Sequence, residues 1–278
     1  MTEPKPLSLT RRNALTAAAA LAASTGLGSS RASAALDLTA PENELELYVR
    51  MRGGVEDDEL VLWWWSGNVW GKMNDDIAVN LMKVEGLTFQ RLTRTSDTTY
   101  EQVSAGRGTF RDVETNAPLD TWTNPINGVV GTPDRVVSLN RETVSARGPH
   151  RELSDRLIAY EGGFDTPVVN GGKVFMTENF VSKVKGRNAG TVGTSSSLTV
   201  FTADAADMAA DEADFRPCTM NYQSLGGFRP WMGLDNSKGM ISWQVYGQKL
   251  QGNAASAPAD IKSWVEREYP GFLEDPAI

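Results

Sequence analysis

The sequence predicts a mainly β protein: a single antiparallel β-barrel or strongly curved sheet, with flanking N- and C-terminal helices. Three observations support this fold class. Consecutive runs rich in Val, Trp and Thr are joined by short turns, helix-boundary signals lie before the first run and after the last, and no linker or charge block divides them. About eight to ten strands are expected, and a barrel of about eight strands has room inside for one small ligand.

Residues 1–34, ahead of these elements, are predicted to be an export signal. Two adjacent arginines precede a mild apolar run of roughly ten residues, and a small-x-small pattern then suits signal peptidase. A helix needs about 20 apolar residues to span a bilayer, so the run does not predict an anchor. A disordered Ala-rich N-terminus is the alternative. We expect the twin-arginine translocase and signal peptidase as export partners and a periplasmic or secreted location; the signal residues are Arg11, Arg12, Ala32 and Ala34.

Cleavage after Ala34 leaves a single β-rich domain, residues 35–278, that is more acidic than the whole chain. It removes four basic residues and one acidic residue, so the formal charge changes from −8 to −11. This balance argues against nucleic-acid binding, which needs a basic surface. No later stretch approaches 18 apolar residues, so no stable membrane span is expected.

The first element of this domain is a predicted helix over 39–52. An early Pro and acidic residues mark its first turn, and Gly53 ends it. A strand-like period follows over 60–73, where Trp and Val dominate. The runs 81–95 and 98–111 come next with short turns between them, which indicates an antiparallel meander.

The rest of the chain contains further strands and two helices. The stretch 140–172, which contains Pro149 and two Gly-Gly pairs, is expected to be irregular. The acidic, Ala-rich stretch 204–215 predicts a surface helix, and 260–269 predicts a C-terminal helix ended by Pro270. Strands are expected at 120–122, 129–139, 174–185, 197–202, 217–223 and 239–250.

The chain contains one His and one Cys, which excludes several chemistries. A single Cys cannot form an internal disulfide or a thiolate zinc site, and a single His rules out two-His and three-His metal sites. No metal and no cofactor are predicted. Haem bound through His150 is the alternative to an ordinary surface position for that residue. Cys218 lies in an expected strand and is interpreted as buried and inert.

The run Trp63-Trp64-Trp65 is the most unusual local feature. In a strand, Trp63 and Trp65 face one side, and Trp64 faces the other side with Asn68 and Trp70. Core packing explains such a run, but indoles also offer stacking area and an N–H donor to a ring-bearing or sugar ligand. The candidate ligand-binding residues are Trp64, Asn68, Trp70, Trp122, Asn124, Arg229 and Trp231.

Four residues are candidate catalytic acids or bases: Glu85, Glu178, Tyr222 and Tyr246. Both carboxylates share a strand face with apolar residues, where an unpaired charge is costly and the pKa of a carboxyl group tends to rise. Such groups suit general acid–base chemistry, and either tyrosine could donate a proton to a substrate oxygen. The alternatives are an ion pair such as Glu85 with Arg91, simple exposure, or ordinary packing of the tyrosines.

Five segments of the chain resemble one known family. They are 44–53, 83–86, 121–128, 229–233 and 269–272, and the Trp-x-Asn-Pro-x-x-Gly piece that starts at Trp122 is the most specific. On these segments the chain is identified as a member of the family catalogued as domain of unknown function eighteen thirty-eight. The resemblance covers nearly all of the chain after the signal. It implies an exported single domain and supplies no catalytic residues.

Three functions stay open on the sequence alone. The first is a β-barrel-like protein that binds a small hydrophobic or aromatic molecule in an aromatic-lined cavity. The second is a metal-independent enzyme, such as an isomerase, lyase or hydrolase, that uses Glu/Tyr acid–base chemistry in the same cavity. The third is a structural or interaction protein of the cell envelope. A buried carboxylate that converges with a tyrosine would favour the enzyme, and an apolar cavity would favour the binding protein.

Overall fold

Antiparallel strands make up about half of the structure, a computed structural model that describes residues 35–185 and 192–278. The predicted signal residues Arg11, Arg12, Ala32 and Ala34 lie outside these ranges. The strands are β1 (Val61–Met73), β2 (Val79–Ser96), β3 (Thr99–Arg111), β4 (Trp122–Thr123), β5 (Val130–Gly131), β6 (Val136–Ser145), β7 (Gly148–His150), β8 (Leu157–Phe164), β9 (Val168–Asn170), β10 (Lys173–Lys185), β11 (Val192–Asp204), β12 (Thr219–Gly226) and β13 (Gly239–Leu250).

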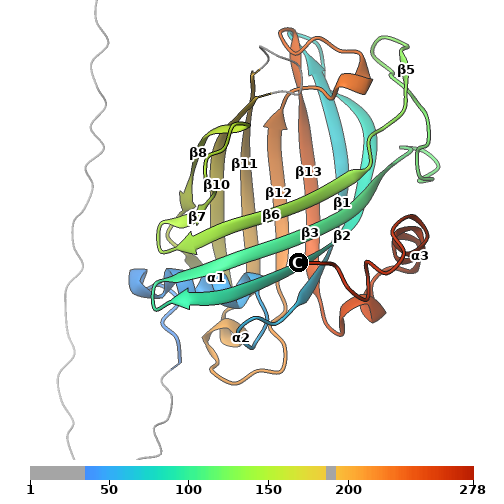
Figure 1. Ribbon diagram of the computed structural model, residues 1–278. Helices are drawn as coiled ribbons and strands as arrows, with labels where there is room; N and C mark the ends of the chain where they lie inside the picture. The colour runs from blue at the N-terminus through green and yellow to red at the C-terminus, as the bar shows by residue number, and fades with distance from the viewer. Residues whose placement is uncertain (1–34, 186–191) are drawn as a thin grey trace, which may run out of the picture. The chain divides into compact units, whose positions relative to one another are not determined.

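Eleven of these strands form one sheet that curves into a nearly closed barrel (Figure 1). The strand order is β7-β6-β3-β2-β1-β13-β12-β11-β10-β8, and β9 pairs with β10; β4 and β5 form a separate pair. The ends of the sheet meet at Gly148 and Gly163. A Cβ atom on Gly148 would lie 2.6 Å from the Gly163 Cα atom, and Gly148 has a φ of +102°. Only glycine tolerates both conditions, so these two residues allow the barrel to close.

Helices flank the barrel at both ends of the folded chain, which confirms the predicted fold class. The short helix η1 (Pro41–Asn43) leads into α1 (Glu44–Arg52), which ends at Gly53 as expected. None of the described helices has the length and apolar composition that a bilayer-spanning helix requires. The other helices are α2 (Ala205–Ala209), η2 (Pro230–Met232), η3 (Asn253–Ser256) and α3 (Ala259–Glu268).

The first core lies inside the barrel, where α1 packs across one end (Figure 1). Leu47, Tyr48 and Met51 of α1 are completely buried against inward-facing residues that include Met176 and Phe201. Each fully buried apolar side chain contributes roughly 1.5–3 kcal/mol. The helix therefore closes this end of the barrel with apolar side chains.

Two further cores lie at the other end of the barrel and on its outer face. Phe110, Ile241 and Val245 face inward and pack against residues outside the main sheet that include Trp122 of β4 and Met232 of η2. On the outside of the barrel, α3 covers an apolar surface of the sheet. The residues of this outer core are Leu62, Leu87, Phe89, Ala105, Leu250, Ile261, Trp264, Val265 and Phe272.

The structure corrects several predicted boundaries. The stretch 140–172 is not irregular: it contains the end of β6 and all of β7, β8 and β9. β7 folds back on β6 across a short turn, and β8 and β9 both pair with β10, so the Pro and Gly residues of this stretch lie within or between paired strands. The predicted helix over 204–215 is limited to Ala205–Ala209. The run 129–139 divides between β5 and β6, so the described strands exceed the eight to ten expected.

Candidate functional site

A chain of hydrogen-bonded polar side chains crosses the barrel next to α1. We call it the interior network; its members are Tyr48, Arg52, Gln90, Gln102, Glu142, Arg151 and Glu178. The Tyr48 hydroxyl donates to Glu178 at 2.9 Å and lies 3.1 Å from Gln102 Oε1. Gln102 Nε2 donates to Glu142 at 2.8 Å. The network thus joins α1 to strands on both sides of the barrel.

Two arginines balance the two carboxylates of this network. Arg52 donates to Glu178 at 3.0 Å and to Gln90 Oε1 at 2.5 Å, and Arg151 Nε donates to Glu142 at 2.6 Å. Burial raises the pKa of Glu178 above its ordinary value, and the Arg52 charge opposes this rise. Burial also raises the pKa of Tyr48 well above its ordinary value. Glu178 is therefore held by a cation and a hydroxyl.

Farther from α1, the inner faces of β8, β10, β11 and β12 carry several hydroxyl groups. We call this surface the hydroxyl wall: Tyr160, Ser182, Ser195, Ser197 and Tyr222. The strand registers place Ser182 beside both Tyr160 and Ser195, and alternation puts all five residues on the face that contains Met176 and Phe201. The Ser182 and Ser195 hydroxyls are 2.8 Å apart and satisfy each other.

Two buried hydroxyls of the hydroxyl wall have no hydrogen-bond partner among the described residues: Tyr160 Oη and Ser197 Oγ. Ser197 is only 8% exposed. The Tyr160 ring stacks on Phe180 with 5.4 Å between ring centres, and burial raises the pKa of its hydroxyl. An unpaired buried hydroxyl costs about 1–3 kcal/mol, so each calls for a water molecule or a ligand group.

Aromatic side chains from β1 and β13 complete this inner surface. Trp65 and Trp243 face inward and remain half-buried. The Trp65 ring lies over Gly86 and Gly108: a Cβ atom on Gly86 would be 2.2 Å from Trp65 Cζ2. Its Nε1 donates to Thr88 Oγ1 at 2.9 Å, which fixes the indole. The two tryptophans therefore offer partly accessible ring surface beside hydroxyl groups.

The four predicted catalytic residues do not gather in one place. Glu178 and Tyr222 face inward, in one row across β10, β11 and β12, so their backbones are about 10 Å apart. Glu85 and Tyr246 lie on the outer face, where both contact Trp64. Burial raises the pKa of Tyr222.

Glu85 forms an ion pair, but its partner is not Arg91. Arg111 Nε lies 2.7 Å from Glu85 Oε2, and Trp64 Nε1 donates to Glu85 Oε1 at 2.9 Å. Arg91 pairs instead with Asp58. The expected partner was wrong because the sheet register, rather than spacing along one strand, brings Arg111 diagonally across from Glu85.

The predicted ligand-binding residues separate into two groups. Trp64, Asn68 and Trp70 share the outer face, as alternation predicted, so they do not line the barrel interior. Trp70 lines an open outer hollow of about 330 Å³ with Leu225 and Met240, and its Nε1 has no partner among the described residues. A ligand role for these residues stays a prediction.

The second group lies where loops cover the barrel end opposite α1. The Trp122 and Trp231 rings are 5.4 Å apart, and Asn124 donates to the Met232 carbonyl at 2.7 Å. Trp231 Nε1 has no partner in the described part of the chain. The Arg229 guanidinium lies 5.8 Å from the ring centre of Trp243. This group therefore approaches the inner aromatic surface, and its role in binding also stays a prediction.

The single His and Cys occupy different environments. His150 is exposed on β7, with its ring centre 6.2 Å from that of Tyr160. Cys218 is buried, and burial raises the pKa of its thiol to about 11. Within the described residues, no group of three or more His, Cys, Asp or Glu side chains is arranged to hold a metal ion.

Comparison with known proteins places the chain in a family. Residues 58–278 match the family described as protein of unknown function (DUF1838). The chain belongs to this family. DUF1838 membership confirms the resemblance found in the sequence, and no curated protein matches the chain.

One solved structure resembles this DUF1838 protein weakly. It is the crystal structure of Ail, the attachment invasion locus protein of Yersinia pestis. The match has 8% identity and a TM-score of 0.28, and it covers 70% of this chain and 99% of that one. A TM-score this low carries no argument about fold or function.

Several residues of the DUF1838 protein that matter structurally were not predicted. Tyr48 and Arg52 are spaced i, i+4 on a helix, which places them on one face, but only the folded barrel brings Glu178 to them. Trp243 shares a strand face with Val245, a pattern visible in the sequence. Tyr160 lies in the stretch expected to be irregular, so no local signal marked it.

Proposed function

We propose that this protein binds a small ring-bearing molecule with a hydroxyl or carbonyl group, against the hydroxyl wall inside the barrel. The observation that carries the proposal is the pair of buried hydroxyls, Tyr160 Oη and Ser197 Oγ, without partners among the described residues. Each of these hydroxyls can pair with an oxygen atom of a bound ligand. Phe180 and Trp243 supply ring surface for stacking.

The charges of the interior support binding rather than catalysis. Glu178 is engaged by Arg52 and by the Tyr48 hydroxyl, so it is not poised to exchange protons with a ligand near Tyr222. Glu85 lies on the other face of the sheet. The proposal needs no metal or cofactor. Haem at His150 is the alternative, and absorbance of the purified protein near the haem band tests it.

The proposal is tested by calorimetric titration of the full chain with 2-naphthol and with naphthalene. The two probes share a ring system, but only 2-naphthol has a hydroxyl that can pair with the wall. We expect tighter binding of 2-naphthol, and a loss of about three- to tenfold in its affinity for Tyr160→Phe or Ser197→Ala, since a lost hydrogen bond costs about 0.5–1.5 kcal/mol.

The matched control is Tyr246→Phe, which removes the same hydroxyl from an exposed tyrosine on the outer face. It should leave the affinity for 2-naphthol unchanged. Equal effects of Tyr160→Phe and Tyr246→Phe would contradict the interior site. Loss of binding in Trp70→Phe alone would place the ligand in the outer hollow instead.

We also propose export through the twin-arginine route to the periplasm or the medium. Adjacent Arg11 and Arg12, the apolar run and the pair Ala32 and Ala34 occur in the order that this route requires. Replacing both arginines with lysine should retain the chain inside the cell at its precursor mass. An unchanged exported fraction would refute the route.

A further inference from the structure

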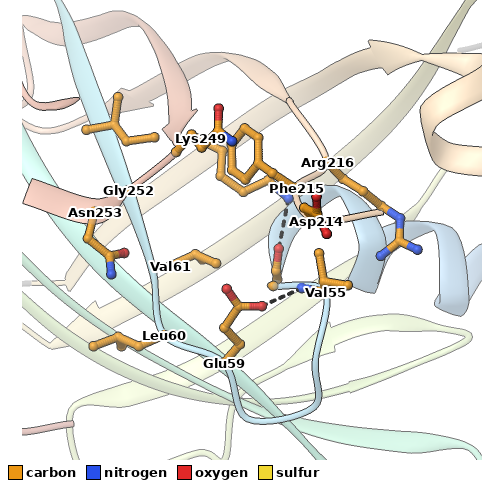
Figure 2. Close-up of a pocket in the computed structure, with 14 residues that line it drawn as sticks. Val55, Glu59, Leu60, Val61, Asp214, Phe215, Arg216, Lys249, Gly252 and Asn253 are labelled. Atoms are coloured by element: carbon orange, nitrogen blue, oxygen red, sulfur yellow. Dashed lines mark hydrogen bonds between the residues drawn. The ribbon is translucent and has the colours of Figure 1, made fainter. Parts of the chain in front are cut away.

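A small pocket lies at the α1 end of the barrel, apart from the hydroxyl wall. Its volume is about 190 Å³, and Lys249 of β13 lies on its lining with Glu59, Phe215 and Asn253 around it (Figure 2). A water molecule occupies about 30 Å³ of liquid, so the space corresponds to roughly six waters. It can hold an organic molecule of a few heavy atoms.

Lys249 is the only buried lysine among the described residues, with 6% of its surface exposed. Its Nζ donates to the Gly53 carbonyl at 2.8 Å and to the Arg50 carbonyl at 3.0 Å. No carboxylate of the described residues forms a salt bridge with it. Two neutral acceptors match the two N–H groups of a neutral amine, and they leave its lone pair free. An ammonium would have a third donor without an oxygen acceptor among the described residues, and its nearest aromatic face would be the Phe215 ring, whose centre lies 5.9 Å from Nζ.

We propose that Lys249 is a nucleophilic lysine that forms an imine with small aldehydes entering this pocket. The amine lone pair attacks the carbonyl carbon, a C–N bond forms, and one amine proton moves to the carbonyl oxygen. The C–O bond of this carbinolamine then breaks. Water leaves with the carbonyl oxygen and both amine hydrogens, and the C=N bond remains. No oxidant, reductant or metal is required.

The electrostatics of the pocket support this assignment. Burial is the main cause that lowers the pKa of Lys249 to about 8; Arg216 acts in the same direction, and Cys218 and Glu59 oppose it. At pH 7 an amine with a pKa of 8 is about 9% neutral, against about 0.04% for a lysine at its ordinary pKa. The reactive form is therefore roughly 200 times more abundant.

The experiment is reductive labelling of the full chain with propanal and cyanoborohydride at pH 7, followed by peptide mass spectrometry. The exposed Lys72, Lys173 and Lys238 in the same digest are internal controls. We expect Lys249 to be propylated at least tenfold faster than any of them, with a rate that rises with pH to a midpoint near 8. Comparison within one folded sample avoids dependence on a variant that fails to fold.

Pocket size gives a second arm to the test. Pyrene carboxaldehyde exceeds the pocket, so it should label the exposed lysines and spare Lys249. Labelling of Lys249 by propanal at or below the rate of Lys238 would overturn the proposal. Preferential labelling by the bulky aldehyde would overturn the assignment of the pocket. Lys249→Arg should remove the fast-labelled peptide and leave the control peptides unchanged.

Discussion

Arg52→Met removes the cation that pairs with buried Glu178 and keeps a side chain of similar length. In the folded protein, Arg52 Nη1 lies 3.0 Å from Glu178 Oε2, and only 6% of the Glu178 side chain is exposed. The substitution leaves the carboxylate with the Tyr48 hydroxyl as its remaining partner. Removing one member of a buried ion pair costs about 3–5 kcal/mol. That is a large fraction of the roughly 5–15 kcal/mol that stabilises a typical protein.

The cost should depend on pH because Glu178 can be protonated. Burial already raises the pKa of Glu178, and loss of Arg52 removes the main opposing charge. A carboxyl group whose folded pKa lies above its unfolded value of 4.5 takes up a proton more readily in the folded state. The destabilisation is therefore complete above the folded pKa, and it declines as the pH falls toward 4.5.

The assay is urea unfolding of the full chain at pH 7 and pH 5, followed by tryptophan fluorescence. We expect Arg52→Met to lower the unfolding free energy by about 3–5 kcal/mol at pH 7 and by clearly less at pH 5. The double variant Arg52→Met/Glu178→Gln should recover about half of the loss or more, because no buried charge is left unpaired. A loss below about 1 kcal/mol at pH 7, or an equal loss at both pH values, would refute this account of the interior network.

Three further predictions concern other parts of the structure. Gly86→Ala should destabilise the fold by about 1–3 kcal/mol in urea unfolding, since its Cβ would overlap the Trp65 ring. Gly226→Ala should cost much less, because its Cβ would meet only Ser195 Cβ at 3.8 Å, an ordinary contact. The unfolding free energy of the natural chain, relative to that of Lys249→Met, should rise by about 3 kcal/mol between pH 8 and 10.5. The reason is that the pKa of Lys249 is lowered in the folded state, so the unfolded chain binds its proton more strongly. A difference between the two chains that does not change with pH would contradict the burial of an uncharged Lys249. Cys218, whose burial raises the pKa of the thiol to about 11, should react with a thiol reagent at pH 8 only at the rate of unfolding, and rapid labelling would disprove its burial.

Much of the barrel was predictable because its long strands carry local signals. The runs 60–73, 81–95, 98–111 and 239–250 correspond closely to β1, β2, β3 and β13. Each is long and rich in β-branched or aromatic residues. The segment 157–164 was missed because it contains Gly162-Gly163 and gains its strand structure from pairing with β10. Pairing partners distant in sequence leave no local trace.

The candidate site was predictable only in part. Alternation correctly separated Trp64 from Trp63 and Trp65, because side chains in any strand point to alternate faces. It could not say which face is inside. That depends on closure of the whole sheet and on α1, which packs against the face of Met176 and Phe201.

The sequence by itself determined the β-rich fold class, the flanking helices, the family and the narrow chemistry left by one His and one Cys. These properties follow from composition and from patterns within a few residues. Only the tertiary structure decided that Glu178 meets Arg52, that Glu85 meets Arg111, and that Lys249 is buried beside two carbonyls. The physical reason is that the partner, burial and pKa of a charged group depend on strand register and barrel closure, which join residues far apart in the chain.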